Sequence, residues 1–65
     1  MTVNLKDFKQ DQEVSLKHKS APIAIQGKIF MEFDDELGRL EVIDPRANAI
    51  FMIQPNDMFW EISAK

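Results

Sequence analysis

The stretch from Ile23 to Asp34 constrains the fold more than any other part of the chain. Five of its apolar side chains share one parity, namely Ile23, Ile25, Ile29, Met31 and Phe33. Successive side chains of a β-strand point to opposite faces, so this pattern predicts one long strand over residues 23–33 with an apolar face. Gly27 lies in the middle of that row, and a glycine allows a strand to bend because it has no Cβ. A long bent strand in a chain of 65 residues is typical of a small barrel.

The rest of the chain predicts one short helix and four further strands. Asn4 is a suitable N-cap for a helix over residues 4–10, in which Leu5 and Phe8 anchor one face. Alternating apolar residues, or apolar runs between turn residues, predict strands over residues 13–19, 39–43, 49–53 and 58–62. The run over 49–53 is apolar throughout, which is typical of a strand buried on both faces. Short connections favour one domain over residues 1–65, mainly β, whose antiparallel strands close into a small barrel.

The composition excludes several classes of function. The chain has no cysteine and one histidine, which argues against a thiol nucleophile, a disulfide and a zinc site. The formal net charge is −3, so the chain as a whole is not a polyanion binder. No apolar run approaches the roughly 20 residues of a membrane helix, and the first residues do not resemble a signal peptide. We therefore expect a soluble cytoplasmic protein with no cofactor, no metal and no membrane partner.

No catalytic constellation is visible, and we expect that the protein is not an enzyme. None of the serines has a nucleophile-elbow context; they are Ser15, Ser20 and Ser63. His18 lies on the inward parity of the strand over 13–19, which favours a packed or edge residue over a general base. The acidic residues 34–36 favour a solvated turn, since hard cations usually draw ligands from several positions.

Three lysines and one phenylalanine form a candidate basic patch. Lys17 and Lys19 lie on the outer parity of the first strand, and Lys28 and Phe30 lie on the outer parity of the second. If these strands pair as a hairpin, basic side chains and an aromatic ring share one face. Proteins use such a combination to bind single-stranded nucleic acid. The simpler interpretation is a solvated face with Phe30 buried under the helix or in a subunit contact, and the residues alone favour it.

The order of elements resembles that of the Sm-like family, which includes the LSm proteins and Hfq. Residues 23–29, then Phe33-Asp34 and then residues 40–42 are similar to its first motif, and residues 52–58 are similar to its second. The spacing from Gly27 to Asp34 is one residue longer than the family usually has, which predicts a bulge. Gly38 stands where the family commonly has an RNA-contacting asparagine. Gln54-Pro55 stands where it has Arg-Gly or Lys-His.

The resemblance implies an SH3-like (Sm-like) barrel that assembles into a homo-oligomeric ring of about five to seven subunits. In such rings the fourth strand of one subunit pairs with the fifth strand of the next. The candidate interface residues are Ile50, Phe51, Met52, Ile53, Met58, Trp60 and Ile62. An apolar strand such as 49–53 would be an aggregation hazard if it stayed open at an edge, so composition and resemblance agree.

The resemblance also implies binding of single-stranded RNA, as a regulator or chaperone, around a pore lined by the loops 34–38 and 54–57. The candidate RNA-binding residues are Asp34, Gly38, Gln54, Asn56, Lys17, Lys19, Lys28 and Phe30. The alternative is a ring or barrel that binds another protein and has lost RNA affinity. The net charge of −3 and the replaced asparagine and arginine favour that alternative.

Overall fold

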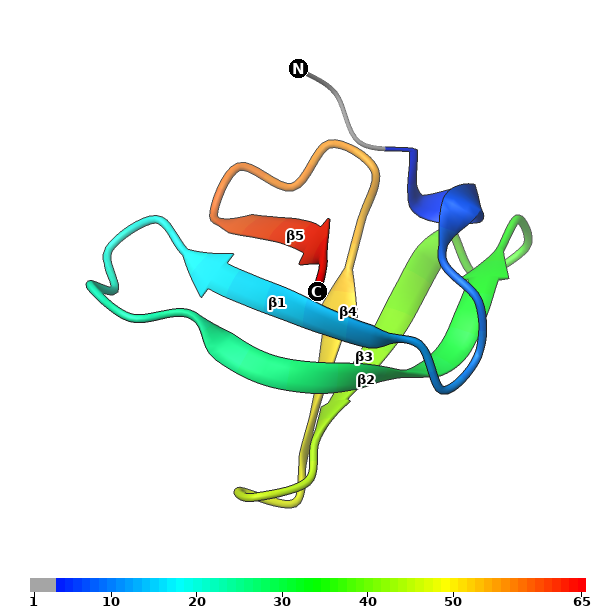
Figure 1. Ribbon diagram of the computed structural model, residues 1–65. Helices are drawn as coiled ribbons and strands as arrows, with labels where there is room; N and C mark the ends of the chain where they lie inside the picture. The colour runs from blue at the N-terminus through cyan, green and yellow to red at the C-terminus, as the bar shows by residue number, and fades with distance from the viewer. Residues whose placement is uncertain (1–3) are drawn as a thin grey trace.

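Residues 4–65 are described by a computed structural model, and they form one five-stranded antiparallel sheet preceded by a single 3-10 turn (Figure 1). The turn is η1 (Leu5–Asp7), and the strands are β1 (Glu13–His18), β2 (Ile25–Asp34), β3 (Arg39–Asp44), β4 (Ala49–Ile53) and β5 (Trp60–Ala64). Their order in the sheet is β4-β3-β2-β1-β5. The expectation of a mainly β fold with five antiparallel strands is confirmed, and β4 and β5 are its two edges.

The predicted helix over residues 4–10 is wrong in length and type. The Asn4 side chain accepts a hydrogen bond from the Lys6 N–H, as expected of an N-cap, but Phe8 is already extended. Three residues later the N–H of Asp11 donates to the carbonyl oxygen of Ile29, so the backbone there bonds to β2 and not within a helix. No helix in residues 4–65 has the length and apolar character of a membrane span.

The core lies on one face of the sheet and draws on every strand and on η1. Its buried side chains are Leu5, Phe8, Val14, Leu16, Ile29, Leu40, Val42, Ile53 and Ile62. The half-buried side chains of Ile25, Phe33, Phe51 and Trp60 pack around them. Leu5 and Phe8 anchor the N-terminal segment to the sheet, as the sequence predicts.

Gly27 allows the backbones of β2 and β3 to approach closely. A Cβ at this position would lie 2.8 Å from the carbonyl oxygen of Ile43 and 2.9 Å from Cγ1 of Val42. Both distances are shorter than real Cβ contacts, so a larger residue would push the strands apart.

The pairing of β2 with β3 contains the irregularity that the extra residue before Asp34 predicts. The register shifts between Ile29 and Met31, and again between Met31 and Asp34. An added residue on one strand changes the face on which the following side chains lie. Met31 therefore lies opposite Glu41 and is exposed, so the expectation that it shares the buried face of Ile29 is wrong. Ile23 precedes the strand and is also exposed.

The two edge strands differ from their predicted forms. Strand β4 is buried on one face only: Phe51 and Ile53 face the core, whereas Ile50 and Met52 are exposed. Burial on both faces is therefore wrong for the single chain. Strand β5 begins at Trp60 instead of residue 58, because the preceding residues are held in a turn described below.

Candidate functional site

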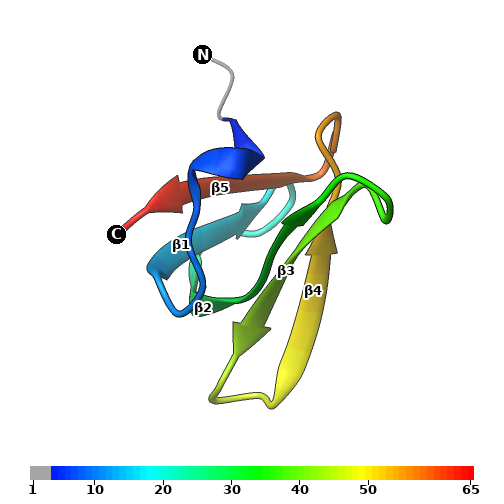
Figure 2. The ribbon, with the colours of Figure 1, turned by 90° about the vertical axis from the view of Figure 1, so that its right-hand side faces the viewer.

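Two turns lie side by side at one end of the sheet (Figure 2). The β2–β3 turn follows Asp34, and the turn after β4 begins at Gln54. Asp34 lies opposite Arg39, and Leu40 lies opposite Ile53, so the register brings both turns to the same end. The RNA-binding candidates that this end of the sheet holds are Asp34, Gly38, Gln54 and Asn56.

Asp34 and Gly38 build the β2–β3 turn. The Asp34 Oδ1 accepts hydrogen bonds from the backbone N–H of Glu36 (2.8 Å) and Leu37 (3.3 Å). The Gly38 N–H donates to the Asp34 carbonyl oxygen at 2.7 Å, and Gly38 has a φ of 69°, a conformation that favours glycine. Both residues therefore have a structural role that explains their presence without a ligand.

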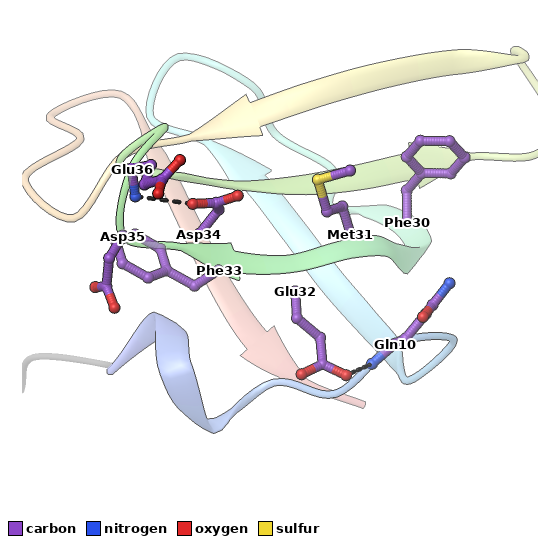
Figure 3. A pocket seen from close by; sticks show the side chains of 8 residues that line it. All are labelled: Gln10, Phe30, Met31, Glu32, Phe33, Asp34, Asp35 and Glu36. Carbon is purple, nitrogen blue, oxygen red and sulfur yellow. Dashed lines mark hydrogen bonds between the residues drawn. The ribbon is translucent and has the colours of Figure 1, made fainter.

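A shallow acidic hollow lies beside this turn (Figure 3). Its lining residues are Gln10, Phe30, Met31, Glu32, Phe33, Asp34, Asp35 and Glu36. The Gln10 N–H donates to Glu32 Oε2 at 3.1 Å, and the Lys6 ammonium lies 3.1 Å from Asp35 Oδ1. Within residues 4–65, no three His, Asp or Glu side chains are grouped so that they could hold a metal ion. The carboxylates at this end of the sheet would repel the phosphates of a nucleic acid.

The turn from Gln54 to Asp57 directs the chain from β4 into β5. The Asp57 N–H donates to the Gln54 carbonyl oxygen at 3.1 Å. The Asp57 Oδ1 accepts from the N–H of Phe59 at 2.8 Å and of Trp60 at 2.9 Å, which fixes the start of β5. Gln54 and Asn56 are exposed, so their amides are accessible.

The three candidate lysines do not form one continuous basic patch. Lys28 lies opposite Glu13, and Lys17 lies opposite Glu61, so each faces an acid across the sheet. Glu13 and Lys17 are at opposite ends of β1, which separates Lys28 from the other two lysines. Lys19 follows the end of β1 and has no acid opposite it in the ladder.

Phe30 also lies apart from Lys17 and Lys19. It sits at the register shift of β2, beyond the residue that pairs with the first residue of β1. Phe30 is 44% exposed, and its ring points to the same side of β2 as Met31 (Figure 3). It is not covered by η1, so the alternative in which the helix buries Phe30 does not hold for the single chain.

The candidate interface residues divide between the core and the two open edges. Ile53 and Ile62 are buried in the core, and the rings of Phe51 and Trp60 contact each other with centroids 5.1 Å apart. The exposed members of the set are Ile50, Met52 and Met58. The apolar surface that a second copy could cover is therefore smaller than the full set of candidates.

Sequence reasoning did not find a group of rings where β1 meets β5. The rings of His18 and Phe59 are stacked with centroids 5.9 Å apart, and Trp60 approaches His18 edge-on at 4.8 Å. His18 is half-buried here, in line with the predicted packed residue. The parity of the two strands was visible in the sequence, but the ring contacts depend on the register His18↔Trp60, which no local pattern reveals.

Comparisons with protein families, with curated proteins and with solved structures find no match for this chain. Its function is therefore inferred from its own residues, and the Sm-like resemblance stays a hypothesis.

Proposed function

We propose that this protein is the subunit of a homo-oligomeric Sm-like ring that binds single-stranded RNA and catalyses no reaction. In this proposal the sheet of each subunit curls into an SH3-like barrel. The observation that carries the proposal is the strand order, which leaves β4 and β5 as the two edges of the sheet.

Open sheet edges are templates for pairing with another chain, because their outer N–H and C=O groups are unpaired. Here one edge, β4, exposes Ile50 and Met52, and exposed Met58 precedes the other edge, β5. Pairing β4 of one copy with β5 of the next is a head-to-tail contact, and such contacts form a ring when the rotation between successive copies closes. The same pairing would cover the exposed apolar residues at the two edges, namely Ile50, Met52 and Met58.

The charges favour one side of the molecule for RNA. The β2–β3 turn carries Asp34, Asp35 and Glu36, whereas Lys17 and Lys19 lie at the end of β1 on the opposite side of the molecule (Figure 1). RNA phosphates would therefore meet the lysine side chains at the C-terminal end of β1. A ring repeats this weak site in every subunit, so avidity multiplies the affinity for a strand that reaches several subunits.

A second candidate function is a ring that binds another protein. The acidic turn from Asp34 to Glu36 favours it, because a carboxylate-rich surface suits a basic partner and repels nucleic acid.

Light scattering after size exclusion tests the ring. We expect a mass of about five to seven times the 7.5 kDa of the chain. A clean monomer at micromolar concentration would overturn both candidate functions as stated.

Fluorescence anisotropy with short U-rich and A-rich RNA tests the ligand. We expect binding at about 50 mM salt that weakens markedly at about 200 mM, because phosphate contacts release counterions. A ring that binds neither RNA at low salt would instead support the protein-binding function.

A further inference from the structure

We propose that Phe59, with His18 and Lys19, forms a stacking site for an unpaired nucleobase of single-stranded RNA. This inference rests on the proposed RNA-binding function and assigns it to particular side chains. It replaces Phe30 with Phe59 as the aromatic partner of the basic residues.

The ring of Phe59 is exposed, yet its backbone is held on two sides. Its N–H donates to Asp57 Oδ1 at 2.8 Å, and its carbonyl oxygen accepts from the Lys19 N–H at 2.7 Å. The second bond continues the β1–β5 ladder one step beyond the pair His18↔Trp60. Phe59 is 59% exposed, and an exposed aromatic residue on a fixed backbone is preorganised for a planar ligand.

His18 supports the Phe59 ring from one side. The two rings are nearly parallel, with an interplanar angle of 9° and centroids 5.9 Å apart. His18 is itself oriented, because its Nδ1 accepts from the Ser20 N–H at 3.1 Å and Trp60 packs against it edge-on. A nucleobase that stacks on Phe59 would extend the existing His18–Phe59 stack.

Charged groups of both signs lie beside this ring: Lys17 and Lys19 on one side, and the Asp57 carboxylate that accepts from the Phe59 N–H on the other. Lys19 lies directly across the ladder from Phe59, and Lys17 is exposed two residues before it on the same parity of β1. Glu61 lies opposite Lys17 and offsets part of its charge. Lys19 has no acid opposite it in the ladder, so its ammonium group is the one that contacts a phosphate. Proteins that bind single-stranded nucleic acid without sequence preference combine exposed aromatic rings with basic side chains in this way.

The test compares two exposed phenylalanines in the full chain by fluorescence anisotropy with short single-stranded RNA. Phe59→Leu keeps an apolar side chain but removes the ring, and we expect affinity to fall about 5-fold or more, while Phe59→Trp retains it. Phe30→Leu is the matched control and should bind like the wild type. Equal affinities of Phe59→Leu and the wild type would overturn the stacking site while leaving RNA binding intact.

A charge variant gives an independent measurement. Lys19→Gln should weaken binding and lower the slope of log affinity against log salt by about one, whereas Lys28→Gln should change neither. An unchanged salt slope for Lys19→Gln would contradict the phosphate contact.

Two further outcomes separate this inference from the proposed function. A wild-type protein that binds no RNA at low salt would overturn both. A change in oligomer mass for Phe59→Leu in light scattering would show that the Phe59 side chain is a subunit contact. That result would overturn the stacking site.

Discussion

At the scale of single residues, the two glycines of the chain are needed for different physical reasons. Gly27 leaves room for the backbone of β3, whereas Gly38 adopts a positive φ in open space. Alanine at each position therefore tests a different effect, and each effect has its own control.

Gly27→Ala should destabilise the fold by about 1–3 kcal/mol, because its Cβ would overlap the Ile43 carbonyl oxygen and a Val42 methyl group. The measurement is the midpoint of urea unfolding at unchanged slope. Wild-type stability in this variant would show that β2 and β3 are farther apart than described.

Gly38→Ala should cost about 1–2 kcal/mol through backbone strain alone, since nothing lies within 4 Å of the added methyl. Gly38→Asn should cost less, because asparagine tolerates the left-handed conformation. The same urea titration compares the two variants; an asparagine as costly as alanine would rule out strain as the cause. A loss of RNA binding in both variants under conditions where both remain folded would indicate a ligand role for this turn.

At the scale of elements, Asp57 decides where β5 begins and how Phe59 is presented. Its Oδ1 accepts from two backbone N–H groups, so Asp57→Ala should lower the free energy of unfolding by about 1 kcal/mol. The variant should also weaken RNA binding, as Phe59→Leu does. Asp57→Asn retains an acceptor oxygen and serves as the control. Thermal unfolding and anisotropy measure the two effects; a destabilised Asp57→Ala with unchanged affinity would separate the turn from the binding site.

The elements themselves were largely predictable, and their ends were not. Strands are visible because alternation of side chains has a period of two, as at Val14 and Leu16, although the register shift in β2 breaks the alternation at Met31. The start of β5 depends on hydrogen bonds such as that from the Phe59 N–H to Asp57 Oδ1, which a local pattern does not contain. The same holds for the candidate site. The sequence shows that the three lysines lie on outward positions, but the register decides that Lys28 lies opposite Glu13 and Lys17 opposite Glu61.

At the scale of the whole molecule, the strand order separates two kinds of exposed apolar residue. Met31 and Met52 flank Glu41 on the outer face of the sheet, one on the central strand β2 and the other on the edge strand β4. Both therefore neighbour Glu41, but Met52 lies on an open edge, whereas Met31 lies at a register shift and lines the acidic hollow. This pair offers a matched test of the ring.

Met52→Glu should reduce the oligomer to smaller species, whereas Met31→Glu should leave the mass unchanged. Both variants place a carboxylate beside Glu41, and Met31→Glu adds one to the acidic hollow, so the control should lose at least as much single-chain stability as Met52→Glu. Only Met52 borders the proposed neighbour, whose β5 carries Glu61 and would repel the new charge. Light scattering at several protein concentrations measures the mass, and urea unfolding checks that both variants are folded. Equal masses for the two variants would place the subunit contact elsewhere than on β4.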